Sequence, residues 1–113
     1  MYNTPFDVFR NTYEYNNIYY LFMQDDEDKI LKLKKCLGQI FKDIRKEKNF
    51  KSLNIFALEN GINRANLSKI ENGEVGCSIV TAWRISEALG LKLSDVIKIL
   101  ENELGDDFKL IEE

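Results

Sequence analysis

The stretch SLNIFALENGINRANLSKIENG, residues 52–73, decides the fold of this chain. Its pattern predicts two short helices joined by a tight turn at Gly61, a residue type that adopts a positive φ without steric cost. Ser52 and Asn63 are suited to begin the two helices, because their side-chain oxygens accept backbone N–H groups of the first turn. The stretch therefore predicts a helix, a turn and a second helix.

The second of these helices is expected to have a buried face and an outer face. The apolar residues Ile62, Leu67 and Ile70 recur at helical spacing, which predicts that they pack inward. The outer face then carries four side chains at positions i, i+1, i+4 and i+5, namely Arg64, Ala65, Ser68 and Lys69. A helix presented in this way fits a DNA major groove, which is roughly 12 Å wide.

Helical patterns continue on both sides of this stretch. Apolar residues at helical spacing between Ile30 and Ile44 predict a helix that begins near the acidic cluster at residues 25–28. Ser78 and Ser94 are the expected N-caps of two more helices. After the first helix, which is expected to end near Lys48, the four predicted helices span residues 53–60, 64–72, 79–89 and 95–103.

Five helices joined by short connections, with no convincing strand, predict an all-α, five-helix domain over residues 29–104. Residues 1–28 are rich in aromatic and acidic side chains, and Pro5 and the asparagine pair at 16–17 are expected to interrupt any long element there. This region is therefore predicted to be an N-terminal arm with at most one short helix. An acidic C-terminal tail is expected over residues 105–113.

The charge of the chain is divided along its length. The net charge is −3, yet residues 29–73 hold eleven lysines and arginines against four acids, a net charge of +7. Residues 1–28 and 74–113 each carry −5. A basic middle between acidic ends is typical of a surface that binds a polyanion. The alternative is a lysine-rich first helix that is merely solvated.

Catalysis and metal binding are not expected. The chain has no histidine, the commonest general base and metal ligand, and it has no Gly-rich phosphate-binding loop. No catalytic residue, cofactor or metal site is predicted, and no apolar run is long enough to predict a membrane span. The distant Cys36 and Cys77 favour a reduced, cytoplasmic protein with both thiols buried, and a disulfide is the alternative.

Residues 67–73, LSKIENG, resemble the end of the recognition helix in the lambda-repressor-like (Cro/CI, or XRE) helix-turn-helix family. A second match, spaced over residues 78–93, resembles the family's fourth helix and the start of its fifth. The resemblance extends from about Ile30 to Leu100. It implies the family's fold and the function of a sequence-specific DNA-binding transcriptional regulator, most simply a repressor, that reads the major groove as a dimer.

The resemblance also implies roles for individual residues. The side chains that would face base edges are Arg64, Ala65, Ser68 and Lys69. Those that would contact phosphates are Ser52, Asn63 and Asn72. Glu71 resembles a glutamate that pairs with a basic residue of the first helix, here Arg45 or Lys46. Leu53 replaces a common glutamine and Glu74 begins a commonly basic loop, so fewer phosphate contacts than usual are implied.

The last predicted helix has an apolar face that is wider than a small core needs. Together with the tryptophan, this face predicts a surface for a dimer or partner, formed by Trp83, Val96, Ile97 and Leu100. Double-stranded DNA and a second copy of the chain are the expected partners. The alternative function is an antitoxin or protein-interaction module of the same fold that binds a partner protein such as a toxin. Salt-dependent binding to duplex DNA favours the regulator, whereas co-purification with a partner protein favours the alternative.

Overall fold

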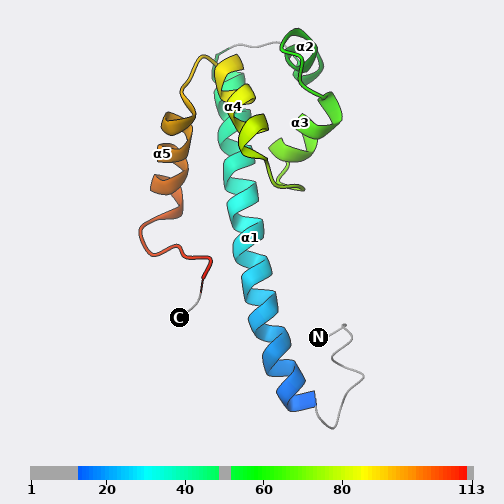
Figure 1. The fold of residues 1–113 in the computed structure, drawn as a ribbon, viewed down its shortest axis with the longest axis vertical. Helices are drawn as coiled ribbons and strands as arrows, with labels where there is room; N and C mark the ends of the chain where they lie inside the picture. The colour runs from blue at the N-terminus through cyan, green and yellow to red at the C-terminus, as the bar shows by residue number, and fades with distance from the viewer. Residues whose placement is uncertain (1–12, 49–51, 112–113) are drawn as a thin grey trace.

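The computed structural model describes the backbone of residues 13–48 and 52–111, and the side chains from residue 27 onward within those ranges. This part of the chain contains five helices and no strand (Figure 1). The helices are α1 (Tyr13–Glu47), α2 (Leu53–Glu59), α3 (Arg64–Glu71), α4 (Ile79–Ala88) and α5 (Leu93–Leu104). The all-α, five-helix prediction is therefore confirmed.

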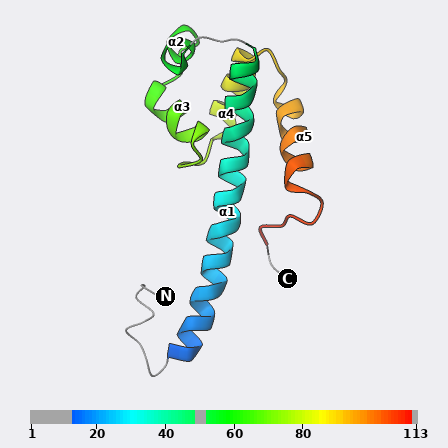
Figure 2. The same ribbon diagram turned by 180° about the vertical axis from the view of Figure 1, so that it is seen from behind.

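Helix α1 begins much earlier than the sequence predicted. Residues 13–28, expected to belong to an irregular arm, are continuous with the rest of α1 and extend it beyond the other helices (Figures 1 and 2). The chain has no glycine or proline between Tyr13 and Gly38, and asparagine lowers helix stability by only a fraction of a kcal/mol, about 0.7 at most. The pair at 16–17 therefore does not end the helix, and positions 25–28 lie inside it. The rest of the predicted arm, residues 1–12, lies outside the described residues.

Three of the four predicted N-caps are present. The side-chain oxygens of Ser52, Asn63 and Ser78 each accept a hydrogen bond from the backbone N–H three residues further on. Ser94 is not an N-cap, because α5 begins at Leu93 and its N-cap is Lys92, whose side chain makes no capping bond. The Lys92 carbonyl instead accepts the backbone N–H of Asp95 at 3.0 Å. Leu93 packs against the core, which accounts for the earlier start of the helix.

The core lies around the C-terminal half of α1. Figures 1 and 2 show α5 on one side of this helix and the α2–α3 pair on the other. Helices α3 and α5 both contact α1, whereas α2 packs against α3 and α4 packs against α5. The buried apolar side chains come from all five helices and the turns between them: Ile40, Phe41, Phe56, Ala57, Ile62, Leu67, Ile70, Ala82, Ile85, Leu89, Val96 and Leu100.

The acidic tail packs against α1. After Gly105, the ring of Phe108 lies under the Lys32 ammonium, with 5.9 Å between Nζ and the ring centroid. Leu110 lines a shallow pocket that Ile30 and Leu33 of α1 also line. The described part of the tail, which carries Asp106 and Asp107, therefore turns back along α1 as far as Lys32.

Candidate nucleic-acid interface

Helix α3 is held with one face in the core and the other outward. Gly61, at φ +63°, makes the turn from α2 into α3, and Ile62, Leu67 and Ile70 are buried as predicted. The outer face carries Arg64, Ala65 and Lys69, which are exposed, and Ser68, which is half-buried. The four side chains that the sequence assigned to base edges therefore share the face that is turned away from the core.

Arg64 is oriented by a residue that sequence reasoning missed. Its Nε donates a hydrogen bond to Oδ1 of Asn54 in α2. Because a guanidinium has five N–H donors, this contact still leaves both terminal amino groups of Arg64 available to a ligand. The two residues are ten positions apart, so the pairing depends on the angle between α2 and α3, which the sequence does not reveal.

The three predicted phosphate-contacting residues lie at helix ends. Ser52 begins α2 and Asn63 begins α3, and both are exposed. Their oxygens accept the capping N–H groups, but the Ser52 hydroxyl hydrogen and the Asn63 amide hydrogens remain available as donors. Asn72 is the C-cap of α3, and its side chain is exposed.

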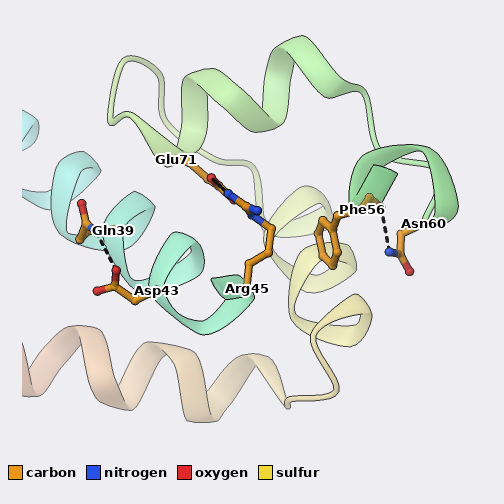
Figure 3. Close-up of polar contacts among 6 residues, drawn as sticks. All are labelled: Gln39, Asp43, Arg45, Phe56, Asn60 and Glu71. Carbon is orange, nitrogen blue, oxygen red and sulfur yellow. Dashed lines mark hydrogen bonds and ion pairs between the residues drawn. The ribbon is translucent and has the colours of Figure 1, made fainter. Parts of the chain in front are cut away.

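A buried ion pair joins the end of α3 to α1. Figure 3 shows Arg45 and Glu71 facing each other, with Nε 2.7 Å from Oε2 and Nη2 2.9 Å from Oε1. Both residues are buried. The hydrogen bond to Glu71 raises the pKa of Arg45 above its already high usual value. Of the two basic partners left open by the sequence, the one that pairs with Glu71 is Arg45.

Figure 3 also shows two hydrogen bonds within single helices, one in α1 and one at the end of α2. On α1, Nε2 of Gln39 donates to Oδ1 of Asp43 at 2.7 Å, which links successive turns of the helix. At the end of α2, Nδ2 of Asn60 donates to the Phe56 carbonyl at 2.8 Å. The second bond adds a side-chain donor to a helix-end carbonyl that also accepts the backbone N–H of Asn60 at 3.2 Å, next to the turn at Gly61.

Gly38 allows α1 and α3 to approach closely. A Cβ at this position would lie 2.1 Å from the carbonyl oxygen of Ile70 and 2.8 Å from that of Glu71. No other residue fits there without moving one of the two helices. The signal in the sequence was a glycine inside a strongly amphipathic helix, where it costs roughly 1 kcal/mol relative to alanine and so indicates a packing reason.

The outer side of α4 and α5 carries exposed apolar side chains. Ile79, Val80 and Trp83 are 66%, 63% and 55% exposed, and Nε1 of Trp83 donates to Oε2 of Glu87 at 3.1 Å. A groove continues from Trp83 to Ile97. We call this the α4/α5 surface, formed by Ile79, Val80, Trp83, Leu91, Leu93 and Ile97.

The prediction that four residues form a dimer or partner surface is wrong for two of them. Val96 is fully buried and Leu100 is 7% exposed, because α5 packs against both α1 and α4. The apolar face of α5 is thus divided: one edge fills the core of the same chain and only the edge with Ile97 borders the α4/α5 surface.

Other kinds of site have little support in the described residues. No group of three or more cysteine, aspartate or glutamate side chains there is arranged to hold a metal ion. Cys36 and Cys77 are free and only partly buried. Burial raises the pKa of both thiols, and a hydrogen bond from Cys36 to Glu103 at 3.6 Å raises that of Cys36 further. Within the same ranges, no helix is long and apolar enough to cross a membrane.

Comparison with known proteins agrees with this geometry. Residues 41–101, from the second half of α1 to α5, match the Cro/C1-type helix-turn-helix DNA-binding domain family. The chain is also similar to the control protein C.MunI from Mycoplasma sp, with 38% identity over 66 residues that cover 58% of this chain and 89% of that protein. Residues 41–101, which match the family, contain the whole α2–turn–α3 unit and the Arg45–Glu71 pair. The chain therefore belongs to the Cro/C1-type helix-turn-helix family and is a DNA-binding regulator.

Proposed function

We propose that α3 enters the major groove of duplex DNA and that Arg64, Ala65, Ser68 and Lys69 face the base edges. The observation that carries this proposal is the division of α3 into a face buried in the core and a face with two exposed cationic side chains. An arginine can donate two hydrogen bonds to guanine O6 and N7, and a lysine can donate to the same acceptors.

The start of α2 and both ends of α3 carry side chains that can bind DNA phosphates. An α3 of eight residues is about 12 Å long, since an α-helix rises about 1.5 Å per residue, and the major groove is about 12 Å wide. A helix that fills the groove therefore has its ends close to the two sugar–phosphate walls. Ser52 and Asn63 would donate to one wall and Asn72 to the other, contacts that position the protein without reading sequence.

We further propose that the chain binds DNA as a two-fold dimer through the α4/α5 surface. One short helix reads only a few base pairs, so two half-sites about one helical turn apart are needed for specific binding. An exposed tryptophan beside two exposed aliphatic side chains gives the surface an apolar centre of the kind found in dimer interfaces. The regulatory outcome we propose is repression, because a bound dimer occludes the DNA that it covers.

Selection of bound fragments from random duplexes tests the DNA-reading proposal. The expected result is an enriched site with two-fold symmetry and half-sites about one turn apart, and affinity that falls steeply with salt because counterions are released. Recovery of fragments without a common sequence would contradict it.

Sedimentation of two variants tests the dimer. Trp83→Glu places a charge in the α4/α5 surface and is expected to give monomers. Ile111→Glu makes the same kind of change at a side chain that is 80% exposed outside that surface, and it should leave the dimer intact. A wild-type chain that is monomeric both free and on DNA would contradict the dimer and favour a partner protein, such as a toxin, as the occupant of this surface.

A further inference from the structure

Two lysines of α1 lie against the loop that follows α3. A Cβ placed on Gly73 would lie 2.5 Å from Cγ and 2.8 Å from Cα of Lys35, so the loop backbone rests directly on the stem of this lysine. A Cβ on Gly76 would lie 4.0 Å from Cε of Lys34. Both lysines are thus next to the loop at residues 73–76, although they precede it by about forty positions.

The charges near this loop favour an anion. Among the described residues, no carboxylate is within ion-pair distance of Lys34 or Lys35. Glu74 is the acidic residue of the loop, and the three side chains Lys34, Lys35 and Glu74 together carry a net charge of +1. Lys35 also lines a shallow pocket with Lys32, Asp28 and Glu103, whose carboxylates lie away from the loop in sequence and offset the two lysines of that pocket. Lys35 is exposed and Lys34 is half-buried, so their long stems cover the loop while the charged ends remain able to reach a ligand.

We propose that Lys34 and Lys35 contact the phosphates of the DNA strand that passes the C-terminal end of α3. This inference rests on the proposed function, in which α3, about 12 Å long, has both its ends near the walls of the groove. Asn72 is an exposed neutral group at that end of α3. The loop at residues 73–76 contains Glu74 and supplies no positive charge at this end of α3. The two lysines of α1 supply it.

Salt dependence separates phosphate contacts from base contacts. Each phosphate that a lysine neutralises contributes about 0.9 to the slope of log affinity against log salt concentration. Loss of both lysines should therefore reduce the magnitude of the slope by about 1.8 for each bound protomer. The ratio of affinities for the selected site and for a single-base variant of that site should not change, because phosphate contacts carry no base information.

The test compares Lys34→Gln/Lys35→Gln with Lys32→Gln/Lys109→Gln. The control removes the same charge, and one of its lysines is on the same helix, but Lys32 faces Phe108 of the tail. Affinity for the duplex selected from random fragments is measured over a range of salt concentrations. The Lys34/Lys35 variant should lose slope and affinity at low salt, whereas the control should keep the wild-type slope.

Three outcomes would overturn the proposal. An equal slope for the two double variants would show that Lys34 and Lys35 do not meet phosphates. A change in base preference would place them at base edges instead. A wild-type chain without salt-dependent binding would contradict the proposed function itself, and it is recognised from the wild-type titration before any variant is compared.

Discussion

The Arg45–Glu71 pair allows a quantitative prediction about how α3 is held. Both partners are buried, at 6% and 5% exposure, and two hydrogen bonds join them. Replacing Glu71 with leucine leaves a buried guanidinium without its partner, and replacing Arg45 with methionine leaves a buried carboxylate. Breaking a buried pair from one side costs about 3–5 kcal/mol. Because domains of this size are stable by about 5–15 kcal/mol, each single variant should lose a large part of its stability.

The double variant Arg45→Met/Glu71→Leu should be much more stable than either single variant. It removes both charges and fills the site with apolar side chains of similar length, a change that is often neutral or stabilising. The free energies of unfolding are measured by urea denaturation followed by circular dichroism. The values for the wild type, the two single variants and the double variant together give the coupling energy of the pair. Single losses below about 1 kcal/mol, within the range of an exposed pair, or a double loss equal to their sum, would refute this reasoning.

Further predictions concern the close approach, a helix cap and the thiols. Gly38→Ala should destabilise the fold by about 1–3 kcal/mol, because overpacking outweighs the gain in helix propensity. The control Gly76→Ala, whose Cβ meets nothing nearer than 4.0 Å, should be near neutral. Equal denaturation midpoints for the two glycine variants would contradict the close approach of α1 and α3. Ser52→Ala should cost about 1 kcal/mol through the lost cap of α2, measured in the same way, and no change would show that this cap contributes nothing. Burial raises the pKa of Cys77, so less thiolate is present at neutral pH and alkylation should be slower than in the urea-unfolded chain. The rate should increase as pH rises through the raised pKa, and equal rates in folded and unfolded chains at neutral pH would contradict this.

Local signals made the α2–turn–α3 unit predictable. A serine and an asparagine at the helix starts, a glycine at the turn and three apolar residues at helical spacing all act within a few residues of each other. The outward face of α3 follows from this spacing once the buried face is known. The partner of Glu71 was narrowed to Arg45 or Lys46, but the choice depends on the rotation of α1 against α3 and needed the structure.

Features that depend on packing between distant segments were not predictable. A glycine inside a helix indicates that Gly38 has a packing role, but that its partner is α3, and that Arg64 contacts Asn54, follows from the angles between helices. Val96 and Leu100 belong to the same apolar stripe as Ile97, and periodicity alone does not show which edge of the stripe the core covers. The start of α1 was misjudged because asparagines and acidic residues were taken as helix boundaries, although neither type prevents a helix from continuing.

The central claim is that the outer face of α3 reads base edges while the helix ends meet phosphates. The most direct test measures binding of Arg64→Ala and Asn72→Ala to the selected site and to singly substituted duplexes at one fixed salt concentration. Arg64→Ala should cost about 1–3 kcal/mol on the selected site and relax preference at one or two base pairs, whereas Asn72→Ala should weaken all duplexes similarly. Equal weakening of every duplex by Arg64→Ala, or no effect of either change in a folded protein, would contradict the claim.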